Sequence, residues 1–113
     1  MKIAVPINAK RGLESEVAEH FGRADNFLIY DTEIKKFDVY PNPEATGGSQ
    51  FPPDFLHSMK VDAVIVFSLG PMAYNKFKDY RIKMCKAIPE NILKNIKEFE
   101  EGNLGELTEK DIF

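Results

Sequence analysis

A short segment in the first quarter of the chain combines side chains that can bind an inorganic ligand. His20, Phe21, Gly22 and Arg23 are consecutive. An imidazole is largely neutral at physiological pH and can donate a nitrogen to iron. Gly22 permits a turn with positive φ, and the permanent cation of Arg23 favours an anionic ligand. The cluster indicates a ligand site, although a buried Phe21, a turn at Gly22 and a merely exposed His20 would also account for it.

The single cysteine, Cys85, is a second candidate metal ligand. We expect it near the carboxyl end of the last strand, at the same sheet edge as His20, where the two side chains could share a site. The alternative is a small buried hydrophobic residue, which is the commoner situation for a free cysteine. One thiol excludes an intrachain disulfide and every metal cage built from paired cysteines.

A turn from Ser68 to Pro71 joins a buried strand to a helix. Backbone N–H groups and the positive end of the helix dipole favour an anion at such a turn. Most strand-to-helix turns share this property, and the fuller glycine pattern of a nucleotide-binding loop is absent. We therefore expect Gly70 to contact a ligand rather than to form a phosphate site by itself.

Motifs for catalysis are missing from the sequence. It contains no GxSxG nucleophile turn, no HExxH zinc motif, no P-loop and no tight group of carboxylates for two metal ions. An activity on an anionic metabolite bound by Arg23 and the Gly70 turn would lack an identifiable base or nucleophile. The residues therefore give no positive indication of an enzyme, and an activity of this kind stays open as a third alternative.

Hydropathy patterns predict the elements that position these residues. Apolar alternation or β-branched runs indicate five strands, at residues 2–7, 27–31, 37–40, 61–67 and 82–87. A long loop from Asn8 to Arg23 with a helical turn over residues 14–19, and a proline-rich surface connection from Pro41 to Pro53, separate some of them.

Three helices are expected after the proline-rich connection. Phe55, Leu56 and Met59 have helical spacing, Pro71 opens a second helix, and Pro89 opens a third that ends at Gly102. The third helix carries one apolar stripe, made of Ile92, Leu93, Ile96 and Phe99.

The order of these elements predicts an α/β fold with a mixed sheet. Helical crossovers require parallel neighbours, whereas the short turn between the second and third strands requires an antiparallel pair. We expect five strands between layers of helices, with the loops that start at Asn8, Ser68 and Lys86 at one edge. Ligands of open α/β sheets bind at this edge.

Size and charge indicate the number of domains and the classes of partner to expect. With 113 residues and 12.9 kDa the chain forms a single domain. The net charge is −3, and six of the 18 acidic residues follow Lys97. We therefore expect a solvated acidic tail with Leu104 and Leu107 as minor anchors, and no nucleic-acid partner. The sequence has neither a membrane span nor a leader pattern, which favours the cytoplasm.

The sequence also resembles a known family. The resemblance lies in residues 1–6, the stretch SEVAEHFGRADNF at residues 15–27, residues 28–31, the strand at 61–67, the turn at residues 69–71, and Asn75 with Phe77. These segments resemble the dinitrogenase iron-molybdenum cofactor biosynthesis family of nitrogenase accessory factor-like proteins. The resemblance covers residues 1–101 as one domain and leaves residues 102–113 as the acidic tail.

This resemblance implies a three-layer α/β/α, ribonuclease H-like fold whose second strand is antiparallel. It implies binding of an iron-sulfur cluster or an iron-molybdenum cofactor precursor, with His20 as the candidate ligand, exchanged with donor and acceptor proteins. One thiol and two imidazoles are too few for a permanent four-iron cluster, so we expect transient binding. The alternative is a metal-free regulatory or adaptor module that binds a protein partner. The sequence does not predict the oligomeric state.

Overall fold

The computed structural model describes residues 1–45, 47–48 and 50–112 of the chain. Thr46 and Ser49, which belong to the predicted connection from Pro41 to Pro53, lie outside the described residues, as does Phe113 at the end of the predicted tail.

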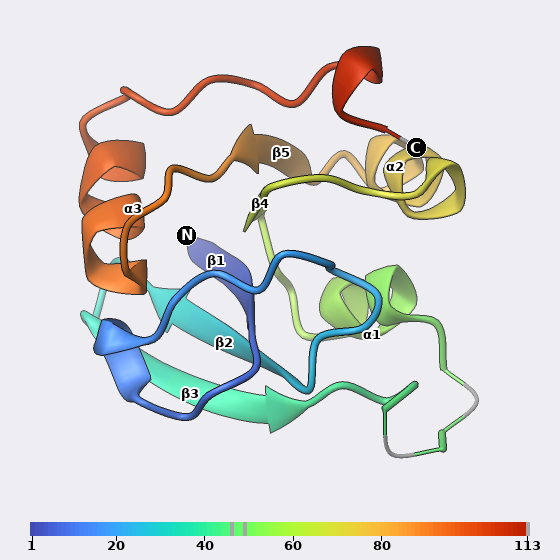
Figure 1. The fold of residues 1–113 in the computed structure, drawn as a ribbon, viewed down its shortest axis with the longest axis horizontal. Helices are drawn as coiled ribbons and strands as arrows, with labels where there is room; N and C mark the ends of the chain where they lie inside the picture. Colours follow the sequence, from blue (N-terminus) through green and yellow to red (C-terminus); the bar gives the residue numbers. More distant parts are fainter. Residues whose placement is uncertain (46, 49, 113) are drawn as a thin grey trace.

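A mixed sheet of five strands forms the centre of the fold (Figure 1). The strands lie in the order β3-β2-β1-β4-β5. β2 pairs antiparallel with β1 and β3, whereas β1, β4 and β5 are parallel neighbours. The predicted mixed sheet with an antiparallel second strand is therefore confirmed. The bounds are Lys2–Ile7 for β1, Asn26–Asp31 for β2, Lys36–Pro41 for β3, Ala63–Val66 for β4 and Lys83–Lys86 for β5.

Helices cover both faces of the sheet and complete the three layers. α1 (Pro52–Ser58) and α2 (Pro71–Asp79) lie on one face. α3 (Ile92–Glu100) lies on the other face. The described residues also form two short 3-10 helices, one at Gly12–Glu14 and one at Glu109–Asp111.

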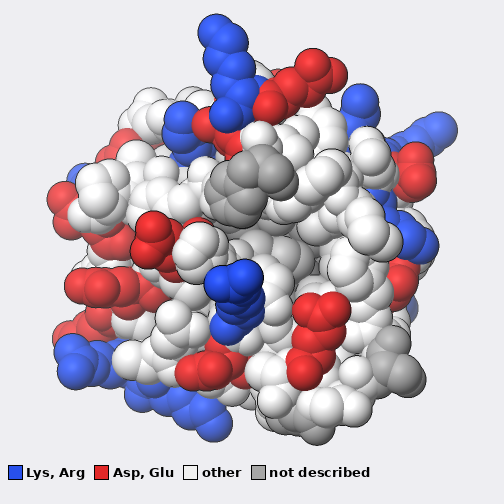
Figure 2. All heavy atoms as spheres, turned by 45° about the vertical axis from the view of Figure 1, so that its right-hand side comes forward, with Lys and Arg blue, Asp and Glu red and all other residues white. Residues whose placement is uncertain are grey.

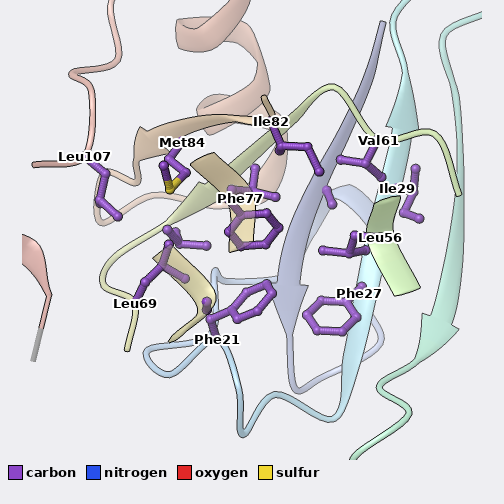
Figure 3. Close-up of a cluster of buried hydrophobic side chains, with 14 residues drawn as sticks. Phe21, Phe27, Ile29, Leu56, Val61, Leu69, Phe77, Ile82, Met84 and Leu107 are labelled. Atoms are coloured by element: carbon purple, nitrogen blue, oxygen red, sulfur yellow. The ribbon is translucent and has the colours of Figure 1, made fainter. Parts of the chain in front are cut away.

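The alternation of side chains along the strands divides the core into two clusters. Val64 and Val66 of β4 point to the face that α1 and α2 cover, whereas Ile65 points to the face that α3 covers. Figure 3 shows the first cluster, in which Phe21, Phe27 and Phe77 lie close together. Every side chain of β4 is buried, as the β-branched sequence predicts for a strand covered on both faces.

Two helices begin at other residues than the sequence indicated. α1 starts at Pro52, inside the predicted connection, because proline is tolerated in the first helical turn, where its missing N–H is not needed. α3 starts after Asn91 and not at Pro89. The side chain of Asn91 accepts a hydrogen bond from the Lys94 N–H at 2.9 Å and caps the helix.

Two further expectations were wrong in detail. The helical turn predicted over residues 14–19 is a 3-10 helix at Gly12–Glu14 followed by extended chain, since Glu16 forms a β-bridge with Asn91. Leu93 does not belong to the buried stripe of α3. It is 53% exposed, whereas Ile92 and Ile96 are buried.

The acidic carboxyl-terminal segment is fixed along the sheet edge. Leu107, one of the two anchors expected from the sequence, is buried, whereas most other residues of the segment are exposed. The segment passes over β5 (Figure 1), and Leu107 is only 4% exposed within the cluster beneath α2. Backbone hydrogen bonds join Lys86 N–H to Gly105 O at 2.8 Å and Leu107 N–H to Met84 O at 3.0 Å. The segment therefore covers the edge of β5 as an additional strand would.

The surface carries charges of both signs. On the face shown in Figure 2, Lys and Arg side chains are interspersed with Asp and Glu side chains, so this face has no extended field of one sign. Within the described part of the chain, no helix has the length and apolar composition needed to cross a membrane.

The packing of the carboxyl-terminal segment predicts the effect of removing its one buried leucine. Leu107→Ala should lower the free energy of unfolding by about 2–5 kcal/mol, because it leaves a cavity in the core. Urea denaturation followed by circular dichroism measures this change. Leu93→Ala, at an exposed position of the same residue type, should change stability by no more than about 0.5 kcal/mol. Similar effects of the two substitutions would contradict the packed segment.

Candidate functional site

The loop that carries His20 is fixed to the sheet on both sides of that residue. Before it, the Ala18 N–H donates to the Pro6 carbonyl of β1 at 2.8 Å. After it, the ring of Phe21 is 5% exposed and packs against two core rings. The ring centroids lie 5.1 Å from Phe27 and 5.4 Å from Phe77. Because Phe21 points into the core, its neighbours His20, Gly22 and Arg23 lie at the surface.

The turn after β4 lies opposite this loop. Leu69 is buried in the same cluster as Phe21, and Figure 3 labels both side chains on the same side of that cluster. Gly70 is the amino-terminal cap residue of α2, and Pro71 is its first helical residue, as predicted. No side chain caps this end of α2. The positive end of the helix dipole is therefore available to a ligand beside Gly70.

The loop and the turn enclose a hollow of about 200 Å³. The residues that the sequence proposed for cofactor binding all line it, although they come from two separate segments. Its lining residues are His20, Phe21, Gly22, Arg23, Ser68, Leu69 and Gly70. A Cβ atom added at Gly22 or Gly70 would meet nothing within 4 Å. Both glycines therefore leave backbone open to a ligand in the hollow.

A second hollow of about 340 Å³ adjoins the first. The two share Phe21, Gly22 and Gly70 as lining residues. Most of the other lining is apolar, and Met72, at the start of α2, is 70% exposed there. The candidate site therefore has a polar part beside His20 and Arg23 and an apolar part beside Met72.

Asn42 holds the loop from beneath and was not identified from the sequence. Its side chain is fully buried, and its amide donates to the carbonyls of Gly22 at 3.2 Å and Ala24 at 2.8 Å. These carbonyls flank Arg23, so Asn42 fixes the backbone that presents the cation. The Asn42-Pro43 pair indicates a turn from the sequence, but nothing in a turn signal shows which backbone groups the amide will reach.

Cys85 does not join His20 in one site. It lies on β5 at the carboxyl end, as predicted, but it pairs in register with Ile65 and points to the face that α3 covers. Phe21 lies on the opposite face. The thiol is 1% exposed, and its burial raises the pKa of Cys85. The role of Cys85 as a metal ligand stays a prediction, and its position is that of a core residue.

The donor set does not form a metal cage. Among the described residues, no three His, Cys, Asp or Glu side chains are grouped so that they could hold a metal ion. The second histidine, His57, stacks its ring on Tyr80 with centroids 3.9 Å apart and is not among the residues that line the hollow.

Comparison with known sequences decides the family. The family described as dinitrogenase iron-molybdenum cofactor matches residues 1–102. The chain belongs to this family. An uncharacterized protein of Methanocaldococcus jannaschii is 36% identical over 110 residues, which cover 92% of this chain and 89% of that protein.

Solved structures share the fold. The apo form of the orange protein from Desulfovibrio gigas has a TM-score of 0.84 at 20% identity, covering 95% of this chain and 92% of that one. A NifB-like protein from Thermotoga has a TM-score of 0.79 at 29% identity, covering 95% and 93%. Both the candidate site and Asn42 lie inside the region that the dinitrogenase iron-molybdenum cofactor family shares, whereas the chain after residue 102 lies outside it.

The contacts of Asn42 predict that its loss loosens the loop. Asn42→Ala should lower the free energy of unfolding by about 1–3 kcal/mol, because the buried hydrogen bond to the Ala24 carbonyl and the partly buried one to the Gly22 carbonyl lose their donor. Amide exchange at Ala24, whose N–H donates to Phe21 O at 3.3 Å, should become faster. Asn75→Ala, at an exposed asparagine of α2, is the matched control and should leave both measurements unchanged.

The burial of Cys85 predicts slow modification. At neutral pH iodoacetamide should react with the native protein at least about tenfold more slowly than with the chain unfolded in urea, because the thiol is inaccessible and its pKa is raised. Mass spectrometry of timed samples gives both rates. Equal rates would show that the thiol reaches solvent and is available to a metal.

Proposed function

We propose that this protein is a non-catalytic carrier that binds a preformed metal-sulfide cluster, either an iron-sulfur cluster or an iron-molybdenum cofactor precursor, at the hollow beside His20. One observation carries the proposal. An exposed imidazole, an exposed guanidinium and two glycines from separate segments line the same small hollow. Membership of the dinitrogenase iron-molybdenum cofactor family supports a role connected with this cofactor.

The residues present fit such a cargo better than they fit a bare metal ion. A cluster brings its bridging sulfides and needs only a few protein contacts, whereas a bare ion needs several protein ligands. His20 supplies one imidazole nitrogen. Arg23 and the amino-terminal end of α2 supply positive charge, which offsets the negative charge of a sulfide-rich cluster.

Few contacts also suit release. A protein that ligates the cluster through one imidazole loses one coordination bond when the cargo leaves, whereas a four-cysteine site would have to break four. The partners implied by this role are metallocofactor donor and acceptor proteins, and the cytoplasm is the compartment we infer for the exchange. We infer no nucleic-acid partner and no membrane partner for this role.

A metal-free adaptor is the second candidate function, and the apolar hollow favours it. Phe51, Pro52 and the exposed Met72 form an apolar surface beside the loop, which suits contact with a protein partner. Iron and sulfide analysis of protein purified without air separates the two functions. Protein that is free of metal and also fails to bind added cluster would favour the adaptor.

The proposed ligand predicts the result of cluster titration. A four-iron cluster preassembled on a small thiol is added without oxygen, and the wild-type protein should gain sulfide-to-iron absorption bands. His20→Ala should lose most of this absorption and bind at least about tenfold more weakly, because the coordinating nitrogen is gone. Arg23→Gln should bind a few-fold more weakly, because it removes only charge attraction.

Two further variants serve as controls for this titration. His57→Ala removes the histidine that stacks on Tyr80 outside the hollow and should bind as the wild type does. Cys85→Ser should also bind normally if the buried thiol takes no part. Equal absorption in the wild type and His20→Ala would rule out a central role for His20.

A further inference from the structure

The carboxyl-terminal segment, residues 103–112, does more than cover the sheet edge. It is joined to β5 by the Cys85–Glu106 β-bridge and by the backbone hydrogen bonds of Lys86 and Leu107 described above. Figure 3 shows the Leu107 side chain near Met84 of β5, at one side of the buried cluster. The segment is therefore fixed to the strand before it turns into the 3-10 helix at Glu109–Asp111.

The carboxylate of Asp111 fastens the end of this segment through both of its oxygens. Lys86 Nζ lies 2.9 Å from Oδ1, and the Thr108 N–H donates to Oδ2 at 2.9 Å. The Asp111 side chain is only 13% exposed. The hydrogen bond from the Thr108 backbone, together with the Lys86 ammonium, lowers the pKa of Asp111, so the carboxylate is ionised at neutral pH.

From this anchored position the segment reaches the wall of the candidate site. The Leu69 N–H donates to the Asp111 carbonyl at 3.3 Å, and Leu69 forms a parallel β-bridge with Ile112. Leu69 and its neighbours Ser68 and Gly70 line the hollow beside His20. The backbone of this turn is thus tied to the carboxyl-terminal segment on one side and borders the hollow on the other.

We infer that Asp111 is a positioning residue for cargo binding. Its ion pair with Lys86 holds the carboxyl-terminal segment as a strap, and the strap holds the Leu69–Gly70 turn in the position that completes the hollow. This inference rests on the proposed function, since it names a determinant of affinity at the same site. The strap lies beyond residue 102, where the family match ends.

The inference predicts weaker cargo binding when the Asp111 carboxylate is removed, whereas electrostatic attraction alone predicts stronger binding. Removing a negative charge near the site should strengthen the binding of an anionic cluster if charge is all that matters. The strap predicts weaker binding, because the wall of the hollow loses its support. The two explanations therefore differ in the sign of the change.

The experiment compares Asp111→Asn with Glu109→Gln, a matched removal of charge at an exposed residue of the same 3-10 helix. Affinity is measured by titration with the thiol-ligated four-iron cluster, and the Leu69 amide is followed by hydrogen exchange. Asp111→Asn should bind about three- to tenfold more weakly and exchange the Leu69 amide about threefold faster or more. Glu109→Gln should bind as tightly as the wild type or slightly more tightly.

A second pair of variants, at Lys86, tests whether the effect of Asp111→Asn comes from the loss of the ion pair or from a folding defect of that one variant. Lys86→Gln should reproduce both changes, and Lys86→Arg should restore both towards the wild-type values. Undiminished affinity and unchanged Leu69 exchange in Asp111→Asn would overturn the inference.

The exchange measurement needs no cargo, so it separates this inference from the proposed function. If the wild type fails to bind the cluster, the proposed function fails and the role of Asp111 in binding fails with it. The Leu69 amide then still shows whether the strap holds the turn.

Discussion

The burial of one aromatic ring determines how the candidate site is presented. Phe21 packs between Phe27 and Phe77, and truncation of such a ring typically costs about 3–5 kcal/mol. That energy is large compared with the stability contributed by the few hydrogen bonds in the irregular loop from Asn8 to Arg23. Because consecutive residues cannot all point inward, anchoring Phe21 leaves His20, Gly22 and Arg23 at the surface. A core contact thus exposes the candidate ligand-binding residues.

Much of this arrangement follows from the sequence, because it depends on local patterns. The β-branched run over Val61–Phe67 predicts a buried parallel strand, and Pro71 predicts the start of α2. With β1 and β4 as parallel neighbours, their carboxyl ends must meet at one edge. The approach of the Ser68–Gly70 turn to the His20 loop was therefore predictable, although the dimensions of the hollow were not.

The features that were missed depend on partners distant in the sequence. Leu107 is recognisable as an anchor of the acidic segment, but the hydrogen bonds of that segment to β5 are not. The ion pair of Asp111 is also missed, because its partner Lys86 lies 25 residues earlier in the chain. The face to which Cys85 points depends on a register in which one residue of shift reverses the side. Placing this cysteine at the strand end was therefore correct, whereas placing it beside His20 required information that the pattern lacks.

The charge balance of the strap explains how an acidic segment can border the site proposed for an anionic cluster. An unpaired carboxylate next to the Leu69–Gly70 turn would repel a sulfide-rich cluster and oppose the attraction of Arg23. Asp111 is instead paired with Lys86 at 2.9 Å, so the pair adds no net charge beside the hollow. The negative charges of Glu106 and Glu109 stay on exposed side chains, where solvent and salt screen them. In the proposed carrier, the segment would thereby support the wall of the site without adding net negative charge from Asp111 beside Arg23.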